Sequence, residues 1–409
     1  MKIGNPLLAR YPVTGDARPR SVWDLQVFDG KIYMANGDYW NNRGPVDIWT
    51  YAGSGTNFVL EYTTNEEMVW DLFALNGRLF IPGVDAREAS PDIANLYIND
   101  PARTPNPGWL KQRTLTGGVH SYDLALFQNN LFASMTLASG ARTMVSTNLG
   151  QTWLLLTNQY SGLVAFDDFL FLEGTNDYVY TGQTLRKVTP ALYVNQLAMA
   201  RKERYRDGLL YSYPLRWGLT NNPLYFITAA QLTNSGAATV IPAFTNDRVR
   251  DIVVRDDFCF VMTAETLATD LLYRGRIYTS DDLTNWWLSS EFMVPGIPLS
   301  FEILDSRFYV GIGSRFDGTN WDVLKGPEAG SLWEIAPQAE PGVLEPLAEG
   351  GIMLDVAVAP GLPFTIEATP SLEQPAWTPL LTTNVAGEVF SFVDPGTGSE
   401  PIRYYRVFH

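Results

Sequence analysis

A hairpin-like phrase that recurs along the chain places the strongest constraint on its fold. Residues 21–35 read "SVWDLQVFDGKIYMA", which is an alternating apolar segment, an Asp-Gly pair and a second apolar segment. Asp-Gly accepts the positive φ angles of a two-residue hairpin turn, so the phrase predicts two antiparallel strands. Seven copies, aligned on their turns, follow one another at intervals of 39 to 52 residues, at Asp29, Asn76, Gln128, Asp167, Asp207, Asp256 and Asp305.

Repeats of this length that open with a hairpin are typical of β-propellers, in which each repeat forms one four-stranded sheet. In the first repeat the pattern predicts strands at 22–28, 31–35, 46–51 and 58–62. The seventh repeat has no convincing fourth strand, whereas residues 6–13 have the missing pattern. We therefore predict an all-β protein, a seven-bladed β-propeller closed by the N-terminal strand and followed by a small β-sandwich domain.

The repeat period stops after Pro337, which predicts a domain boundary there. We expect the propeller to span 1–337, a linker rich in Pro, Gly and Glu to span 338–351, and a β-sandwich-like domain to span 352–409. In this last segment, "TPSLEQPAWTPLLTT" and "IRYYRVFH" resemble a C-terminal module of exported proteins of environmental bacteria. That resemblance implies nothing about activity.

Composition excludes several classes of protein. The net charge is −15 and no basic run is present, so no nucleic-acid partner is expected. Two histidines argue against a histidine metal cage, and a single cysteine makes a disulfide within the chain impossible. No apolar run reaches the roughly 18 residues of a transmembrane segment. The low share of charged residues, 18%, favours an extracellular or cell-surface protein, with a cytoplasmic one as the alternative.

Two segments between the third and fourth strands of their repeats carry a recognisable motif. Residues 146–153, "STNLGQTW", resemble the Asp box, S-x-D-x-G-x-T-W, of sialidase-like (BNR-like) propellers, with Asn148 in place of the Asp. Residues 280–286, "SDDLTNW", form a weaker copy that lacks the Gly. The resemblance implies the propeller fold and a structural role, in which Ser and Asp tie the turn and Trp packs in the blade. The box marks a fold rather than an activity.

A sialidase activity finds no support in the rest of the sequence. The early F-R-I-P motif of sialidases is absent, and the nearest string, "LFIP" at 79–82, has no Arg in it. No catalytic residue can be carried over. His120 and Ser121 do not form a base–nucleophile pair either, because adjacent residues of a strand point to opposite faces.

An aspartate recurs near the start of the first strand of four repeats, at Asp24, Asp71, Asp123 and Asp251; the other repeats have Gly162, Lys202 and Ser300. One interpretation is a carboxylate ring that binds Ca²⁺ or acts as acid and base. The other is that each Asp accepts hydrogen bonds from backbone N–H groups between blades. Repetition favours the second interpretation, because catalysis is normally confined to one place. We therefore expect no cofactor and no metal, with Ca²⁺ as the alternative.

Aromatic residues cluster in the segments that a propeller brings to the same face as these aspartates. Aromatic faces beside Asp and Asn side chains suit sugar rings. The predicted ligand-binding loop face consists of Trp23, Asp24, Tyr39, Trp40, Trp70, Asp71, Tyr122, Asp123, Phe316 and Trp321. The structural alternative is that these aromatic rings fix long loops to the propeller.

Three functions remain open from the sequence. The first is a non-catalytic binding or scaffolding protein that recognises a glycan or a protein surface, so the sequence leans against an enzyme. The second is a glycoside hydrolase or lyase with candidate acids at Asp24, Asp71, Asp38 and Asp317. The third is a structural subunit of a surface layer, filament or virion that assembles through its C-terminal domain.

Overall fold

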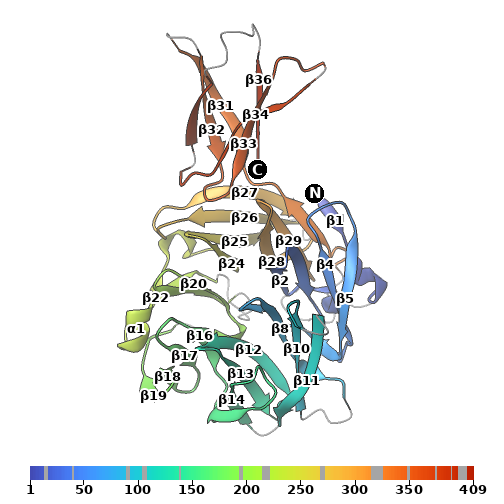
Figure 1. The fold of residues 1–409 in the computed structure, drawn as a ribbon, viewed down its shortest axis with the longest axis vertical. Coiled ribbons are helices and arrows are strands. Elements are labelled where there is room, and N and C mark those ends of the chain that lie inside the picture. The colour runs from blue at the N-terminus through green and yellow to red at the C-terminus, as the bar shows by residue number, and fades with distance from the viewer. Residues whose placement is uncertain are drawn as a thin grey trace.

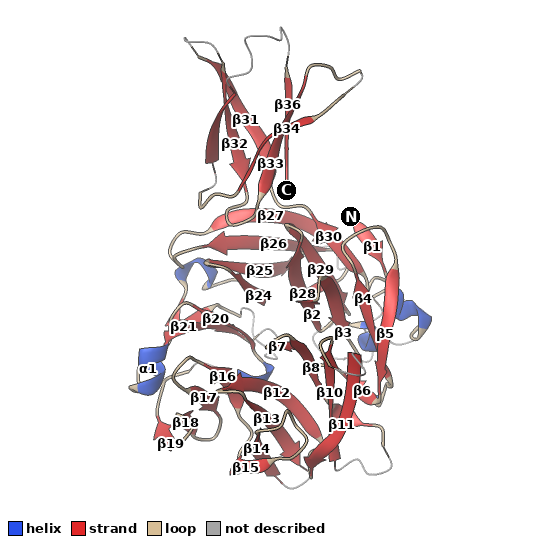
Figure 2. Ribbon diagram, viewed as in Figure 1, coloured by secondary structure: helices blue, strands red, loops and turns tan. Residues whose placement is uncertain are grey.

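The protein folds almost entirely into β-strands, which surround a common centre, and its C-terminal segment projects from one side of that ring (Figure 1). Helices are few and short, and they lie at the periphery and near the centre of the ring (Figure 2). The computed structural model describes residues 1–12, 17–38, 41–88, 93–103, 108–137, 140–192, 197–213, 222–267, 272–314, 326–347, 351–373, 375–387, 389–394 and 403–409.

Within these ranges, seven antiparallel sheets follow the seven repeats of the sequence. The first sheet contains β2 (Asp24–Phe28), β3 (Lys31–Ala35), β4 (Val46–Tyr51) and β5 (Phe58–Thr64). The second contains β7 (Phe73–Leu75), β8 (Arg78–Pro82), β10 (Ile93–Asp100) and β11 (Gly108–Thr116). The third contains β12 (His120–Phe127), β13 (Asn130–Leu137), β14 (Gly140–Ser146), β15 (Leu154–Thr157) and the short strands β6 (Glu66–Met68) and β9 (Val84–Ala86).

The remaining four sheets have the same up-and-down order. The fourth contains β16 (Gly162–Ala165), β17 (Leu170–Glu173), β18 (Asp177–Tyr180) and β19 (Leu185–Val188). The fifth contains β20 (Arg201–Tyr205), β21 (Gly208–Ser212), β22 (Tyr225–Thr228) and β23 (Thr239–Val240). The sixth contains β24 (Val249–Arg255), β25 (Phe258–Thr266), β26 (Tyr273–Ser280) and β27 (Trp287–Val294). The seventh contains β28 (Ile297–Leu304), β29 (Arg307–Gly313), β30 (Leu332–Ile335) and β1 (Lys2–Gly4).

Short helical turns connect some of these strands. The single described α-helix, α1 (Ala229–Thr233), begins with a capping box between Thr228 and Gln231. The 3-10 helices are η1 (Pro6–Ala9), η2 (Arg18–Arg20), η4 (Leu197–Met199) and η5 (Pro242–Phe244). No helix among the described residues is long and apolar enough to cross a membrane.

The hairpin turns have the backbone geometry that the sequence predicts. Asp29 and Gly30 have φ angles of +49° and +69°, and Asn76 and Gly77 have φ angles of +48° and +71°. Positive φ at both turn positions matches the right-handed twist of the flanking strands. The sequence predicts the turns of the third and fifth repeats at Asn129-Asn130 and Asp207-Gly208. In the structure each turn lies one residue earlier, because the returning strands begin at Asn130 and Gly208.

The N-terminal strand lies closer to the chain start than the predicted range 6–13. Lys2–Gly4 pairs with β30, whereas Pro6–Ala9 forms a 3-10 helix. Proline fixes φ and has no N–H to donate to a sheet, so the strand ends before Pro6. The side chains of Ile3 and Leu7 are 5% and 1% exposed, and they anchor this segment in the core between the first and seventh sheets.

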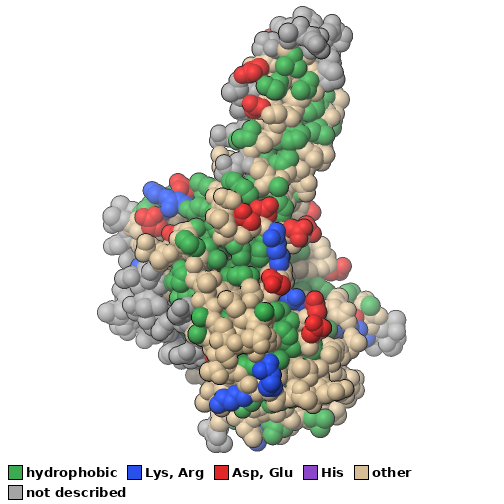
Figure 3. Space-filling model, turned by 90° about the vertical axis from the view of Figure 1, so that its left-hand side faces the viewer, with side chains coloured by type: hydrophobic (Ala, Val, Ile, Leu, Met, Phe, Trp, Pro, Cys, Tyr) green, Lys and Arg blue, Asp and Glu red, His purple; other side chains and the backbone are tan. Residues whose placement is uncertain are grey.

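The C-terminal segment forms a sandwich of two three-stranded sheets. One contains β31 (Ala339–Pro346), β32 (Ile352–Val358) and β35 (Val389–Asp394), and the other contains β34 (Thr378–Thr383), β33 (Phe364–Thr369) and β36 (Tyr404–Phe408). Its small core includes Leu354, Val356, Phe364 and Ile366. From the side the sandwich stands on the ring as a narrow column, with hydrophobic side chains visible along it (Figure 3).

The predicted linker at 338–351 is not free of regular structure, because β31 occupies most of it and pairs with β32. The pairing shifts register between Pro341 and Leu344. A proline interrupts the ladder of hydrogen bonds and is tolerated on an edge strand or at a bulge, and β31 is an edge strand. The division of the chain into independent domains stays a prediction.

Candidate active site in the central channel

The recurring aspartates tie the inner strands of neighbouring sheets together. Asp24 Oδ2 accepts a hydrogen bond from Leu72 N at 2.9 Å. In the same way Asp123 accepts from Leu163 N at 2.7 Å, and Asp251 accepts from Phe301 N at 2.8 Å. Each of these amides belongs to the next sheet along the chain. This observation matches the structural interpretation of the repeat, because a buried N–H between sheets needs an acceptor.

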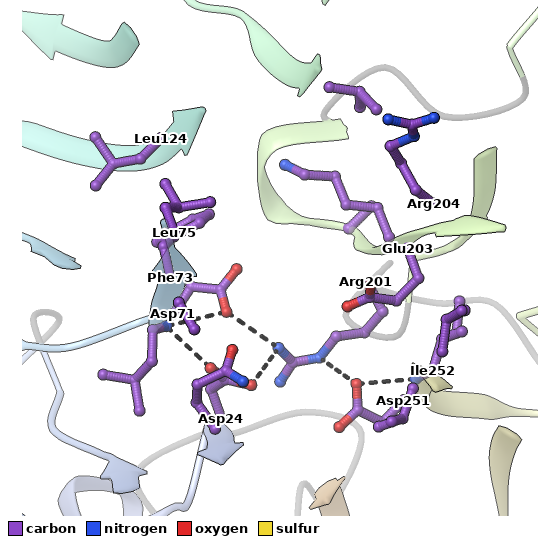
Figure 4. Close-up of a pocket in the computed structure, with 18 of the residues that line it drawn as sticks. Asp24, Asp71, Phe73, Leu75, Leu124, Arg201, Glu203, Arg204, Asp251 and Ile252 are labelled. Atoms are coloured by element: carbon purple, nitrogen blue, oxygen red, sulfur yellow. Dashed lines mark hydrogen bonds and ion pairs between the residues drawn. The ribbon is translucent and has the colours of Figure 1, made fainter. Parts of the chain in front are cut away.

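Arg201, at the start of β20, forms ion pairs with three of the aspartates at the centre of the ring (Figure 4). Its Nη1 lies 3.3 Å from Asp24 Oδ1 and 3.8 Å from Asp71 Oδ1, and its Nε lies 3.3 Å from Asp251 Oδ1. Its Nη2 donates to the carbonyl oxygen of Trp23. The guanidinium therefore joins side chains from four sheets in one ion network. All four charged side chains are mostly buried, with exposures between 7% and 21%.

The neighbouring residue, Lys202, neutralises the fourth aspartate. Lys202 Nζ lies 2.5 Å from Asp123 Oδ2, and it also donates to the carbonyl oxygen of Leu197 at 3.4 Å. Lys202 stands at the position that Asp occupies in four other repeats. The exchange of a carboxylate for an ammonium thus provides a counterion for the fully buried Asp123.

A cavity of about 400 Å³, called the channel pocket below, extends from the Arg201 network along the inner strands. Asp24, Asp71 and Asp251 lie at its floor, beside Arg201. Apolar side chains form part of its wall, beside the polar Gln26, Lys202 and Arg204; they are Phe73, Leu75, Leu124, Leu126, Ala165, Val254 and Leu209. Two further carboxyl groups, Glu203 and Glu302, also line it. The pocket therefore combines an acidic floor with a partly apolar wall.

Several carboxyl groups of the channel pocket hold their protons more tightly than usual. Burial raises the pKa of Asp24 well above its ordinary value, and the neighbouring Asp71 raises it further. Burial also raises the pKa of Asp251 to about 6, although Arg201 opposes the shift. Burial raises the pKa of Glu302 to about 7, although the hydrogen bond that Ile303 N donates to its carboxyl group opposes the shift.

Glu203 has the most strongly raised pKa of the glutamates that line the channel pocket. Its side chain is exposed and lines the channel pocket, among the inner strands of neighbouring sheets. Desolvation is the main cause that raises its pKa to about 8, and the charge of Glu302 is the next. Water in the pocket screens part of this effect.

These shifts predict that the protein is more stable at pH 5.5 than at pH 8. Between the ordinary glutamate pKa and about 8, the folded protein keeps a proton on Glu203 that the unfolded chain releases. Stability therefore falls as pH rises through this window. Melting temperatures measured across it check the sign. Glu203→Gln is expected to flatten the dependence, whereas Glu291→Gln, whose pKa is lowered by Arg276, is expected to leave it unchanged. A melting temperature that rises from pH 5.5 to 8 contradicts the prediction.

The structure buries the aromatic rings that the sequence placed on the ligand-binding face. Trp23, Trp70 and Tyr122 are 4%, 6% and 7% exposed. Trp23 and Trp70 stack on each other with ring centroids 5.5 Å apart, and Trp23 Nε1 donates to the carbonyl oxygen of Gly37. Little ring surface remains for a sugar to stack on. This arrangement is the structural alternative weighed above.

The other predicted site residues divide into three groups. Asp24, Asp71 and Asp123 lie at the centre of the ring, as described above, rather than on an exposed loop face. Asp38 is fully buried and paired with Arg18 at 3.3 Å, which does not suit a catalytic acid. Tyr39, Trp40, Phe316, Asp317 and Trp321 lie outside the described residues.

The Asp-box-like segments make the contacts expected of a structural motif. Ser146 Oγ accepts hydrogen bonds from Asn148 N at 3.3 Å and Gly150 N at 2.8 Å. Asn148 Oδ1 accepts from Thr152 N at 2.9 Å, and Trp153 packs against the apolar core between the second and third sheets. Asp282 caps the second segment in the same manner, with Asn285 N 2.8 Å from its Oδ1. The family resemblance itself stays a prediction.

The sequence analysis missed the cations of the site. Arg201 and Lys202 received no role there, and neither did Glu203 or Glu302. A signal was present, because Arg201 replaces the aromatic residue and Lys202 replaces the Asp in the alignment of the repeats. Among the described residues, no group of three or more His, Cys, Asp or Glu side chains is arranged to hold a metal ion.

Comparisons with known proteins concern the fold. No protein-family model matches the chain, and no curated protein is significantly similar in sequence. Solved structures of prolyl endopeptidases are similar at 11% identity and a TM-score of 0.43, over 86% of this chain and 57% of theirs. The acylaminoacyl peptidase of Pyrococcus horikoshii is similar at 8% identity and a TM-score of 0.46, over 85% of this chain and 60% of its own. The chain thus spans less than two thirds of these peptidases.

A β-propeller domain is also among the similar structures, that of the Trilobed protease from Pyrococcus furiosus, at 8% identity and a TM-score of 0.42 over 70% of this chain and 87% of that domain. The all-β, propeller-like architecture agrees with the prediction. The predicted non-catalytic binding or scaffolding function is contradicted, because several of the similar structures are peptidase-type enzymes or parts of them. Similarity at this level describes the fold, and the activity of this chain has to be inferred from its own residues.

Proposed function

We propose that this chain is an acid–base hydrolase whose active centre is the Asp24–Asp71 carboxyl pair. The observation that carries the proposal is that both carboxyl groups accept a hydrogen bond from the same amide, Leu72 N, at 2.9 and 3.2 Å. They also share the Nη1 atom of Arg201, and both line the channel pocket. Two carboxyl groups held so close together bind one proton between them, because a second negative charge is disfavoured.

The pair suits hydrolysis because one member is an acid and the other a base. Burial keeps the proton on Asp24, whose pKa is raised well above its usual range. In the reaction, Asp71 accepts a proton from a water molecule, and the water oxygen forms a bond to a substrate carbonyl carbon while Asp24 donates its proton to the carbonyl oxygen. The proton taken up by Asp71 then passes to the leaving amine as the C–N bond breaks, and a hydroxyl group of the intermediate returns a proton to Asp24 as the product acid forms. Arg201 stabilises negative charge that develops beside it.

The channel pocket suits a short peptide as the substrate. The apolar part of its wall, which includes Phe73, Leu75 and Leu124, can cover a hydrophobic side chain. Glu203 and Glu302 offer carboxyl groups to a free amino group. A volume of about 400 Å³ has room for a ligand of this size. Peptidases are also the class of enzyme to which several similar structures belong, so peptides are the first substrates to test.

The test is the cleavage of a mixture of short peptides, followed by mass spectrometry. We expect the wild-type protein to release new amino termini. Asp24→Asn and Asp71→Asn each remove one proton-transfer group, so each is expected to lower the rate by about a hundredfold or more. Asparagine keeps the size of the side chain and its acceptor for Leu72 N, so the fold is expected to survive.

Asp123→Asn is the matched control for this experiment. Asp123 has the same position in its repeat and the same hydrogen bond to the next sheet, but it does not line the channel pocket. This variant is expected to lose stability, because Lys202 loses its counterion, and to keep its rate at temperatures at which it is folded. No cleavage by the wild-type protein, or an undiminished rate for Asp71→Asn, refutes the proposal.

We also propose that the seven sheets are the blades of a propeller closed by β1. The pairing of Lys2–Gly4 with β30 supports this closure, since it makes the first segment of the chain part of the seventh sheet. The Asp-box-like turns support membership of an Asp-box group of propellers. An extracellular location rests on composition alone, as stated above.

A further inference from the structure

Arg250 is a buried guanidinium that has no counterion among the described residues. Its side chain is 9% exposed, and within the described residues it makes no hydrogen bond and no ion pair; its Nε is fully buried and unbonded. Burial, together with the charge of Arg248, lowers its pKa to about 10. At that value Arg250 remains charged at neutral pH.

The other buried arginines of the chain show how unusual this is. Arg20, 1% exposed, donates to the carbonyl oxygens of Ala329, Tyr11, Pro12 and Gly326 at 3.0 to 3.2 Å. Arg201 is paired with three aspartates, as described above. A buried charge without a partner is strongly destabilising, so proteins rarely keep one without a use. The charge of Arg250 calls for an anion that the described part of the chain does not provide.

The position of Arg250 in the fold places it next to the proposed active centre. It is the extra residue at a β-bulge between Val249 and Asp251, at the start of the inner strand β24. Asp251 belongs to the Arg201 network, on the floor of the channel pocket. A bulge turns its extra side chain away from the regular alternation of the strand. Arg250 is thus adjacent in the chain to the floor of the pocket but does not line it.

Aromatic residues occupy the corresponding position in other repeats. Trp23, Trp70 and Tyr122 precede the recurring Asp as Arg250 precedes Asp251. They belong to one buried cluster together with Tyr273, which is one of the groups that act on the charge of Arg250. Arg250 therefore lies beside an aromatic cluster at the end of the inner strands where the Arg201 network lies. An apolar surrounding of this kind strengthens the attraction between a guanidinium and an anion.

We propose that Arg250 anchors a subsite for a carboxylate group carried by an apolar or aromatic ligand. The planar guanidinium offers two parallel N–H donors that match the two oxygens of a carboxylate. If the chain hydrolyses peptides, which is the proposed function on which this identification rests, the ligand group is the terminal carboxylate of the peptide. The carboxylate would neutralise Arg250 on one side of the Arg201 network, and the scissile bond would lie at the Asp24–Asp71 pair.

The test compares N-acetyl-phenylalanine with its amide in thermal unfolding of the full chain. A ligand that binds the folded state raises the melting temperature in a saturable manner. We expect the acid to raise the melting temperature of the wild-type protein. The amide is expected to need at least a tenfold higher concentration for the same rise. In Arg250→Met the response to the acid is expected to disappear, and the ligand-free melting temperature to rise, because an uncompensated buried charge is removed.

Two further variants keep the test decisive. Arg276→Met removes an arginine of the same sheet that is already paired with Glu291 at 2.7 Å, so it is expected to keep the response to the acid. Arg250→Lys keeps the charge but not the two parallel donors, so it is expected to need at least tenfold more acid. Equal responses to acid and amide in the wild-type protein, or an unchanged response in Arg250→Lys and Arg250→Met, overturn the proposal.

The same measurement separates this inference from the proposed function, because binding requires no turnover. A response to the acid without any peptide cleavage supports the carboxylate subsite and refutes the hydrolase. Peptide cleavage without a response to the acid refutes the subsite and leaves the Asp24–Asp71 pair as the active centre.

Discussion

Replacing Arg201 with methionine is expected to lower the free energy of unfolding by about 3–5 kcal/mol, which is the usual cost of removing one partner from a buried ion network. The variant leaves the carboxyl groups of Asp24, Asp71 and Asp251 together in a mostly buried site without their cation. It also removes the hydrogen bond to the carbonyl oxygen of Trp23. Denaturant unfolding measures the loss. The loss is expected to be smaller at pH 5 than at pH 8, because the carboxyl groups then take up protons.

Arg204→Met is the matched control, because Arg204 lies on the same strand, β20. Its ion pair with Asp167, at 3.0 Å, is open to solvent, since the Asp167 side chain is 88% exposed. Such a surface pair contributes about 0–1 kcal/mol. A similar loss for both variants, or a loss below about 1 kcal/mol for Arg201→Met, contradicts the central role of the network.

Deleting residues 1–9 is expected to destabilise the ring rather than trim a loose end. The deletion removes the pairing of β1 with β30 and two buried side chains, Ile3 and Leu7. Burial of each such side chain stabilises a protein by about 1.5–3 kcal/mol, so we expect a loss of about 3–6 kcal/mol. It also leaves the edge of β30 unpaired, which favours association with other chains. Thermal unfolding and light scattering measure the two effects.

Lys2→Ala tests whether a side-chain charge explains the effect of the deletion. Lys2 forms an ion pair with Glu328 at 2.5 Å, and its side chain is 40% exposed. The substitution is therefore expected to cost less than about 1 kcal/mol. An unaltered melting transition after the deletion means that the N-terminal strand does not hold the seventh sheet together.

Local features of the sequence predicted the architecture well. The turns at Asp29-Gly30 and Asn76-Gly77 depend on two residues that accept positive φ, and the strands on each side follow from alternation. The strands of the first repeat consequently match the predicted ranges to within two residues. β31 was missed for an equally local reason, because Pro341 makes an edge strand look like a linker.

The site could not be predicted in the same manner, because it forms only when distant strands meet. Asp24, Asp71 and Asp251 were recognised as equivalent, but the alignment does not reveal that one guanidinium joins them. Arg201 stands about 180 residues after Asp24, in the most divergent part of the repeats. Its side-chain direction depends on the ring, whereas the position of each Asp follows from its own repeat. Arg250 was overlooked for the same reason.

The hydrogen bonds between neighbouring sheets also bear on how the repeats can be exchanged or duplicated. A repeat that carries Asp24 or Asp251 contains the acceptor for a backbone N–H of the following sheet. A tandem copy of such a repeat would therefore contain the hydrogen-bond acceptor that ties it to its neighbour. The fifth repeat is different, because Lys202 needs Asp123 from the third. Exchanging the fifth repeat for one with Asp would place two carboxylates together with no cation. The fifth repeat therefore has a fixed place in the ring, because Arg201 and Lys202 both pair with carboxylates of other repeats.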